Sequence, residues 1–447
     1  MTDSDSKVLG VVLLVRHGDR QGFYQNSNTY TPSNTILTPL GNQQEFQLGS
    51  QLRRIYLNES STSHIEGINS TLVNDAQFRV RADAGGEGGV ILNSALSLLQ
   101  GLFPGNSDVN TTLANGTTIT APLGGYQYIP VESVEPENDI SLEGWTSCNT
   151  FSQATATLYK STEFQQIASD NAGFLKALPP YLDGRPVTFE NMWNVFDFMN
   201  VQSIHNEAFA KALPPTYLQQ ARHLANWHEY HVFSDPRPTG IGNIAGQAIV
   251  PSIVNGFKSI LDESDPVKFV YHAISYKPFI SLFNITKAAD TAPELAGIVN
   301  YAAAVALEAR QSASGEPFLR FKFQNGTDSD FKTYQVLGSS TDVPLSTFMD
   351  YIEPLGIESL SEWCSACDNK QDRGCAALYH AAASAVAENQ PKIGSVGAGF
   401  LGAALMLVLA LAMFAVLLFL GVLTIGGSSR RRRSSKGSNV NNVEQKA

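Results

Sequence analysis

The stretch that decides the fold is "VVLLVRHGDRQGF", residues 11–23. Its first five residues, 11–15, have the length and β-branching of a fully buried parallel strand. Arg16, His17 and Arg20 follow at once, at the strand end where open α/β sheets bind their ligands. Clustered guanidinium groups disfavour protonation of an imidazole unless an anion neutralises them. The stretch therefore predicts an α/β sheet with a phosphate-like anion site around a reactive histidine; a solvated strand end with surface salt bridges is the alternative.

Length and composition limit what the rest of the chain can be. The 447 residues suffice for one large domain, or two closely packed ones, with a substantial core. The formal net charge is −11, and no basic stripe appears in the body of the chain. We therefore expect no nucleic-acid partner.

The C-terminal part carries a membrane signal. Residues 400–427 are apolar and uncharged, which exceeds the roughly 20 residues needed to cross a bilayer. We predict a single transmembrane helix over residues 398–426, with the lipid bilayer as a partner, and a basic polar tail over residues 428–447. Because arginines favour the cytoplasmic side, the large N-terminal portion is predicted to be lumenal or extracellular.

The start of the chain conflicts with that orientation. "MTDSDSKVLG", residues 1–10, has no basic segment ahead of an apolar run, so no signal peptide is visible. Insertion by the C-terminal helix alone would leave the domain cytosolic, but the arginines would then have to cross the membrane at high cost. We keep the lumenal or extracellular orientation.

Glycosylation signals and cysteines agree with a lumenal domain. Six Asn-x-Ser/Thr sequons occur, at Asn58, Asn69, Asn110, Asn115, Asn284 and Asn325. The cysteines number four: Cys148, Cys364, Cys367 and Cys375. Two disulfides would fit, with three connectivities open. A zinc site is the alternative, but no His-x₃₋₅-His pair accompanies the cluster.

The order of elements predicts an α/β core interrupted by helices. We expect the core over residues 1–150 and 251–390, and a mostly helical insert over residues 151–250, where aromatic helical segments dominate. Within the core we expect a turn at residues 39–41 leading into a helix to Leu57, a second helix from Val90, strands at 268–274 and 318–326, and a last helix at 375–389.

Four stretches together resemble the histidine acid phosphatase family, a branch of the phosphoglycerate-mutase-like superfamily (histidine phosphatase clade 2). They are "VVLLVRHGDR", "LTPLGNQQEFQLGSQLRRIYL", "SALSLLQGLFP" and "FLRFKFQNG" leading to "VPLSTFMDYI". The similarity spans roughly residues 10–385. It implies a three-layer α/β sandwich with a mostly parallel central sheet.

The resemblance also implies a chemistry. His17 would attack the phosphorus of a phosphomonoester and form a phosphohistidine that water then cleaves. Arg16 and Arg20 would bind the phosphoryl oxygens. The expected substrate is a phosphorylated small molecule, with neither metal nor other cofactor required.

The chain departs from the family pattern in the Arg-x-Thr-Asp-x-Asp-Arg stretch before the second helix. Here the sequence is "RADAGGEGGVILNSA": Arg81 matches the first arginine, and Glu87 stands near the missing second one.

A second departure concerns the family's His-Asp pair, which supplies a phosphate ligand and the general acid. By register Ile274 and Ser275 occupy those positions, and His272 lies two residues early on the same strand face.

Two hypotheses follow from these losses. Either His272 or Glu87 supplies acid–base chemistry in a remodelled pocket, or the protein is a catalytically impaired relative that binds an anionic ligand or partner. A phosphomutase is a third, weaker interpretation. Four further histidines are interpreted as surface or core residues rather than metal ligands: His205, His223, His228 and His231.

Overall fold

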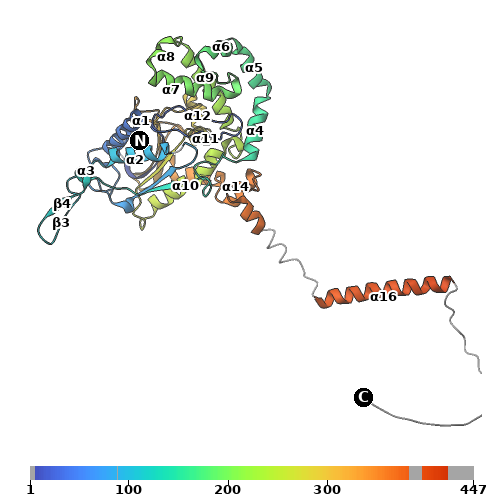
Figure 1. Cartoon of the computed structure of the whole chain (residues 1–447). Coiled ribbons are helices and arrows are strands. Elements are labelled where there is room, and N and C mark those ends of the chain that lie inside the picture. Colours follow the sequence, from blue (N-terminus) through green and yellow to red (C-terminus); the bar gives the residue numbers. More distant parts are fainter. Residues whose placement is uncertain (1–5, 88, 382–394, 421–447) are drawn as a thin grey trace, which may run out of the picture. The chain divides into compact units, whose positions relative to one another are not determined.

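A computed structural model describes residues 6–87, 89–381 and 395–420 (Figure 1). The chain divides into a large unit, Met1–His380, and a second unit, Ala381–Ala447. The large unit contains the sheet and every predicted site residue.

The core of the large unit is an eight-stranded sheet in the order β10-β8-β7-β1-β6-β2-β5, with β9 paired to β8. Strand β1 (Ser6–Arg16) lies in its middle, parallel to β6 and antiparallel to β7. The other strands are β2 (Phe78–Asp83), β5 (Val131–Val134), β6 (Phe269–Ile274), β7 (Ala304–Ser312), β8 (Pro317–Gln324), β9 (Lys332–Thr333) and β10 (Val343–Pro344). A separate hairpin pairs β3 (Asn110–Thr112) with β4 (Thr118–Thr120).

The sheet is mixed. Strands β1, β6, β2 and β5 are parallel, whereas β7 is antiparallel to β1, and β8 is antiparallel to β7. Strand β8 therefore runs in the same direction as β1. Most strands of the sheet share this direction, although the strands on the β7 side of β1 are paired antiparallel to their neighbours. The ends of the parallel strands meet at one edge of the sheet, where the predicted motif begins.

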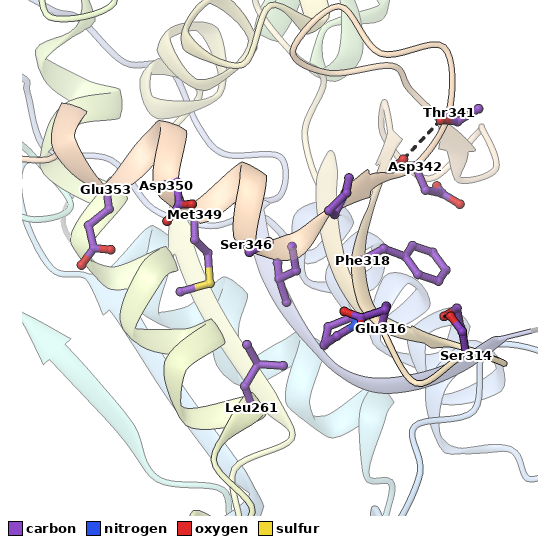
Figure 2. A pocket seen from close by; sticks show the side chains of 14 residues that line it. Leu261, Ser314, Glu316, Phe318, Thr341, Asp342, Ser346, Met349, Asp350 and Glu353 are labelled. Carbon is purple, nitrogen blue, oxygen red and sulfur yellow. Dashed lines mark hydrogen bonds between the residues drawn. The ribbon is translucent and has the colours of Figure 1, made fainter.

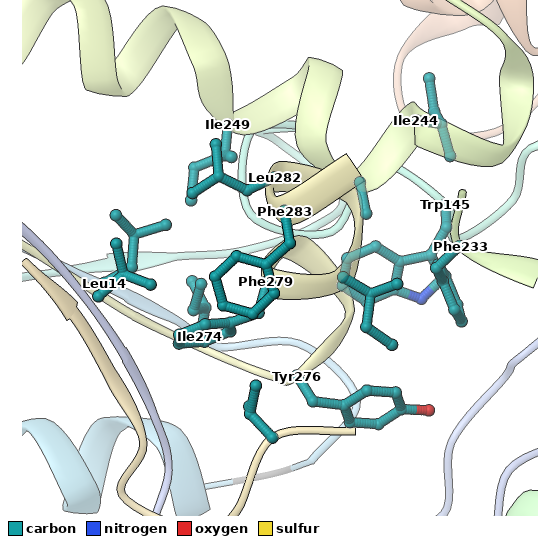
Figure 3. Close-up of a cluster of buried hydrophobic side chains, with 14 of the residues drawn as sticks. Leu14, Trp145, Phe233, Ile244, Ile249, Ile274, Tyr276, Phe279, Leu282 and Phe283 are labelled. Carbon is teal, nitrogen blue, oxygen red and sulfur yellow. The ribbon is translucent and has the colours of Figure 1, made fainter. Parts of the chain in front are cut away.

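Helices cover both faces, as the α/β prediction requires. Side chains of a strand alternate between faces: Val11 and Leu13 join a core with α1 (Pro39–Leu52) and α2 (Val90–Leu102). Leu14 points the other way, into a larger core with α10 (Ile244–Leu261) and α11 (Lys277–Ile285). Figure 3 shows that second core, in which Leu14 and Ile274 of the sheet face Phe279 and Phe283 of α11.

The predicted turn at residues 39–41 is wrong, because helix α1 begins at Pro39. Thr38 caps the helix by accepting a hydrogen bond from the Gly41 amide at 3.1 Å, and a proline in the first turn needs no amide partner. Gly41 packs against the motif so closely that a Cβ there would lie 2.1 Å from the Asp19 carbonyl oxygen. The first turn of α1 therefore fixes the loop that carries the predicted site.

The remaining helices lie mostly in the middle of the chain. They are α3 (Pro122–Gly125), α4 (Asn149–Tyr159), α5 (Thr162–Asp170), α6 (Ala172–Ala177), α7 (Met192–His205), α8 (Glu207–Ala212), α9 (Tyr217–Val232), α12 (Ala288–Thr291), α13 (Leu345–Ile352) and α14 (Leu360–Ala366). Short 3₁₀ turns span Asp75–Gln77, Pro179–Tyr181, Phe189–Asn191, Ile241–Asn243, Pro293–Leu295 and Glu353–Leu355, and a π-helical turn, Arg53–Leu57, follows α1. Helix α10 starts inside the range predicted for the insert yet packs on the sheet, and the insert's limits at 151–250 stay a prediction.

The cysteines form two disulfides, Cys148–Cys367 and Cys364–Cys375. This selects one of the three connectivities left open by the sequence, and it leaves no thiol free for the alternative zinc site. The longer bridge ties the start of α4 to the end of α14.

The second unit contains α16 (Ser395–Phe419), an uninterrupted apolar helix. By length and composition it is a candidate membrane span, as is Ile241–Leu261, which is mostly buried inside the large unit. The end of the predicted transmembrane segment and the basic tail at 428–447 lie outside the described residues, as does most of the last predicted helix, whose residues 375–381 are helical.

Candidate active site

His17 directly follows β1, at the point where Arg16 pairs with Ile274 of β6. Its backbone amide donates to the Ile274 carbonyl at 3.3 Å. The ring nitrogen Nδ1 lies 2.8 Å from the Gly18 carbonyl oxygen, which can only accept, so Nδ1 carries the proton. The side chain is fully buried, and burial lowers its pKa. The atom left for chemistry is therefore Nε2.

Glu87 faces that atom: its Oε2 lies 2.7 Å from His17 Nε2, and both side chains are buried. Burial opposes ionisation of this carboxyl, but the charges of His17, Arg20 and Lys277 hold its pKa well below the ordinary range. Glu87 lies between β2 and α2, in the segment where the resemblance implies a second arginine. A carboxylate thus stands against the imidazole where the resemblance implied a cation.

The two arginines beside His17 differ in what they bind. Arg16 donates through Nη1 to the Val299 carbonyl oxygen, and its guanidinium lies 4.5 Å from the Tyr301 ring centroid. Within the described residues Arg16 has no carboxylate partner. Arg20 binds Asp197 in a bidentate pair at 2.9 and 3.2 Å. Both arginines nevertheless keep a buried Nε–H that has no acceptor in the described part of the chain.

Helix α7 contributes two groups that the sequence analysis missed. Asp197 is the carboxylate that binds Arg20, and His205 places its Nε2 2.7 Å from Asp19 Oδ2. Asp19 also accepts a hydrogen bond from the cap residue Thr38. His205, interpreted from sequence as a surface or core residue, therefore braces the motif loop. No local sequence pattern in α7 predicts either contact.

Lys277 was also missed, although it stands at the start of α11, just after the strand that neighbours β1. It is buried, with its ammonium 4.9 Å from the Trp145 ring centroid. Burial lowers its pKa, and the charges of Glu87 and Glu143 counteract this. The ligand rule for strand ends was applied only to β1; applying it to β6 would have pointed to Lys277.

Two more buried carboxyls lie in this region. Asp83 ends β2 and accepts a hydrogen bond from the Gly85 amide at 2.9 Å, while Glu143 accepts from Thr146 at 3.0 Å. Burial raises the pKa of both carboxyls; the charge of Glu143 adds to the rise at Asp83, and that of Glu87 adds to the rise at Glu143. The candidate site therefore combines buried carboxyls with the guanidinium groups of Arg16 and Arg20 and the ammonium of Lys277.

A cavity of about 180 Å³ opens beside this cluster. It is lined by residues of β1, α1, α7 and α9 and of the connections before β7 and after β8, among them Arg16, Asp197, Arg222 and Tyr301. A larger cavity of about 730 Å³ lies at the β8, β10 and α13 edge (Figure 2). Its lining combines apolar residues such as Phe318 with carboxylates and includes none of the motif residues, whereas Arg16 of the motif lines the smaller cavity.

Metal chemistry finds no support in the side-chain geometry of the described residues. No group of three or more His, Cys, Asp or Glu side chains there could hold a metal ion.

A family model described as the histidine phosphatase superfamily (branch 2) matches residues 22–324. The chain belongs to this superfamily. Human prostatic acid phosphatase is 22% identical over 372 residues, which cover 81% of this chain and 89% of that protein. Human lysosomal acid phosphatase is 23% identical over 376 residues, covering 81% of each. The resemblance implied by the four sequence stretches is confirmed.

Solved structures agree on the fold. A phytase from Citrobacter braakii superimposes with a TM-score of 0.55 at 12% identity, covering 81% of this chain and 99% of that one. The apo form of Hafnia alvei phytase gives 0.54 at 13% identity, covering 82% and 99%. Identities this low support the shared fold and no more.

Two predicted pocket residues lie away from His17. His272 pairs across the sheet with Leu14, three residues before His17, and therefore about 10 Å back along the strand. Arg81 is held by Glu132 and Asp139. Their roles in a pocket stay predictions that the contacts do not favour.

The alignment of Ile274 and Ser275 with the family's His-Asp pair stays a prediction, but both residues lie beside the motif. Ile274 ends β6 opposite Arg16, and Ser275 follows it, level with His17. The Ser275 hydroxyl is buried and has no partner among the described residues. A hydroxyl cannot replace a carboxylic acid as proton donor at acidic pH, so another group must serve if this site turns over substrate.

Proposed function

We propose that the protein hydrolyses phosphomonoesters through a phosphohistidine formed on Nε2 of His17. The observation that carries the proposal is the buried imidazole with its Nδ1 bound to Gly18, flanked by two arginines that each keep an unpartnered Nε–H. Buried donors left without acceptors are costly, and an oxyanion over the imidazole would satisfy them.

The first step is displacement at phosphorus. Nε2 of His17 donates its lone pair to the phosphorus, and the ester P–O bond breaks with its electrons on the leaving oxygen. The Nε–H groups of Arg16 and Arg20 offset the charge that builds on the phosphoryl oxygens. Water then attacks the phosphohistidine, the P–N bond breaks, and inorganic phosphate leaves.

Glu87 is the proton carrier of this proposal. Because Nδ1 carries the ring proton, Nε2 keeps its lone pair, and the Glu87 carboxylate 2.7 Å away is the group that takes up a proton from water as the phosphate binds. An incoming phosphate dianion repels the carboxylate and raises its pKa, which favours the protonated form. Protonated Glu87 then supplies the proton that the leaving oxygen requires, in place of the family's missing aspartic acid.

Substrate and location follow from the relatives and from α16. The matched proteins carry the names acid phosphatase and phytase, which supports a phosphorylated small molecule as substrate. The apolar helix α16 supports a membrane anchor, and a relative named lysosomal supports a lumenal or extracellular large unit. Extraction of membranes with alkaline carbonate tests the anchor: the chain should stay in the pellet, and its release would contradict anchoring.

The hydrolysis of p-nitrophenyl phosphate from acidic to neutral pH tests the activity. His17→Ala should lose at least about 10³-fold in kcat, since the nucleophile is gone. His223→Ala, which removes an exposed histidine, is the matched control and should keep the wild-type rate. Wild-type turnover in His17→Ala would contradict the proposal.

A further inference from the structure

Two guanidinium groups face the small cavity without a counter-ion. Arg16 and Arg222 both line it, and neither forms an ion pair within the described ranges 6–87 and 89–381. Of the lining carboxylates, Asp197 is already bound in bidentate fashion by Arg20. Asp328 is exposed and forms no ion pair with a described residue. The cavity thus has two cations and one free, solvated carboxylate.

Both guanidinium groups donate hydrogen bonds to backbone carbonyls of the same short segment, residues 298–299. Arg16 donates through Nη1 to the carbonyl oxygen of Val299, and Arg222 donates through Nη2 to that of Ile298 at 3.0 Å. Asn226, one turn after Arg222 on α9, accepts from the Ile298 amide at 3.1 Å and fixes the segment. Neighbouring carbonyls therefore bring the two like charges together at one wall of the cavity.

Aromatic rings fix the guanidinium planes as well. The Arg222 guanidinium lies 5.5 Å from the Phe196 ring centroid, and that of Arg16 lies 4.5 Å from the centroid of Tyr301. Such contacts preorganise a guanidinium without using its N–H donors. Burial, and after it the charge of Arg16, lowers the pKa of Arg222, a penalty that a bound anion would relieve.

The size of the cavity limits the ligand. At about 180 Å³ it is smaller than the roughly 300–1,000 Å³ of sites for drug-sized ligands. The lining also includes the side-chain amides of Asn200, Asn300 and Asn325, so polar groups as well as aromatic and apolar residues form the walls. A small, strongly hydrogen-bonding oxyanion fits this description.

We propose that Arg222 supplies a third guanidinium to the phosphate group of the substrate, beside Arg16 on the same wall of the cavity, and so stands in for the cation that the family resemblance implies near Glu87. This assignment rests on the proposed phosphatase function, since it assumes that the anion is a phosphate ester. It places the third cation on α9 and not in the segment between β2 and α2.

Inhibition of p-nitrophenyl phosphate hydrolysis by inorganic phosphate tests the assignment. Arg222→Gln should raise the inhibition constant of phosphate and the KM at least about tenfold, because a charge-assisted contact is lost. Arg222→Lys keeps the charge but loses the fork of donors, so its loss should be smaller. Arg237→Gln, which removes an arginine that is 80% exposed, is the control and should change neither constant.

Calorimetric titration with inorganic phosphate separates this inference from the proposed function. A phosphate complex that Arg222→Gln weakens supports the inference even if the wild type shows no turnover, in which case only the proposed function fails. Phosphate affinity within twofold of wild type in both Arg222 variants overturns the inference, whatever the turnover. Because Arg222 also binds Ile298, thermal unfolding of each variant is measured, and Arg222→Lys decides if Arg222→Gln is unfolded.

Discussion

At the scale of single residues, Glu87 is the largest change from the family pattern. Its Oε2 atom lies 2.7 Å from Nε2 of His17, and the positive charges of Arg20 and Lys277 lower its pKa. In the absence of substrate it is the anion that neutralises the cationic cluster. A phosphate group that approaches Nε2 must therefore compete with this carboxylate.

Removing the charge of Glu87 should separate binding from catalysis. In Glu87→Gln we expect kcat to fall by about 10²- to 10⁴-fold, because the proton carrier is lost. The inhibition constant of inorganic phosphate should fall as well, because no carboxylate repels the anion. Steady-state kinetics with p-nitrophenyl phosphate measure both; Glu163→Gln, at an exposed position, is the control. An unchanged kcat, or weaker phosphate inhibition, would argue against both roles.

The burial of His272 leads to a prediction about how stability depends on pH. Burial, and after it the charge of Arg81, lowers its pKa from 6.5 to about 3, and neither ring nitrogen has a partner among the described residues. The unfolded chain therefore binds the proton more readily than the folded one. The stability present above pH 6.5 is lost progressively as the pH falls towards about 3.

Replacing this histidine with an apolar residue should abolish that loss. Relative to the wild type, His272→Leu should gain about 2 kcal/mol between pH 6.5 and about pH 5, at 1.36 kcal/mol per pH unit. Urea unfolding at the two pH values measures the gain. An equal effect of the substitution at both would mean that His272 does not titrate as described.

At the level of single residues, the sequence predicted the residues of the motif but not the distant residues that bind them. His17 and its two arginines are visible because they are consecutive or nearly so in "RHGDR". Asp197 and Arg222 lie far away along the chain and are ordinary polar residues of amphipathic helices. Only the packing of α7 and α9 over the strand ends brings them to the site, and no spacing rule encodes that contact.

At the scale of elements, α7 braces the motif loop from above the strand ends. Through Asp197 it binds Arg20, and through His205 it binds Asp19. The Arg20–Asp197 pair is almost fully buried, so its loss would leave a charge without compensation.

Asp197→Asn tests that brace. We expect it to destabilise the fold by about 3–5 kcal/mol, the range for breaking a buried ion pair from one side. It also frees Arg20, so inorganic phosphate should raise the melting temperature more in the variant than in the wild type. Asp183→Asn, whose side chain is 89% exposed, is the control. Equal phosphate shifts in the variant and the wild type would show that Arg20 does not meet the anion.

The sequence predicted helices and strands correctly where the hydrophobic periodicity was clear. It failed where a helix cap or a tight turn determines where an element begins. The second helix begins at Val90 as predicted, and the strand predicted at 268–274 is β6. The start of α1 was misplaced because Pro39 was interpreted as a turn rather than as the first residue of a helix capped by Thr38. Strand β7 was missed, although its turn into β8 carries Gly315 with a positive φ of 91°, a hairpin signal.

At the scale of the whole molecule, two disulfides cross-link the large unit, and they differ greatly in the sequence separation of the cysteines that they join. Cys148–Cys367 joins residues 219 apart in sequence, and Cys364–Cys375 joins residues 11 apart. Chain entropy in the unfolded state gives the long bridge a stabilisation of about 5 kcal/mol and the short one about 3 kcal/mol.

Pairwise replacement of the cysteines by serine tests this difference. Cys148→Ser with Cys367→Ser should lower the free energy of unfolding more than Cys364→Ser with Cys375→Ser, as measured by urea titration under non-reducing conditions. The second double variant is the internal control for loss of a bridge as such. Equal losses would mean that the long connection is restrained in the unfolded chain by other means.

The global architecture was predicted in class and only partly in detail. An α/β sheet with helices on both faces follows from the buried strand of residues 11–15 and the helices around it. The antiparallel half of the sheet does not follow, because a buried strand has the same apolar composition in either direction. Its direction is set by the connections, above all by the tight turn between β7 and β8.

The central claim is that the imidazole of His17 carries the phosphoryl group during turnover. Rapid acid-free quenching of the enzyme with ³²P-labelled substrate, followed by peptide mapping, measures it directly. We predict one label per chain, on His17 at Nε2, stable in alkali and lost in acid, and absent from His17→Ala. Full turnover with no label on His17, or a label on another residue, would contradict the account.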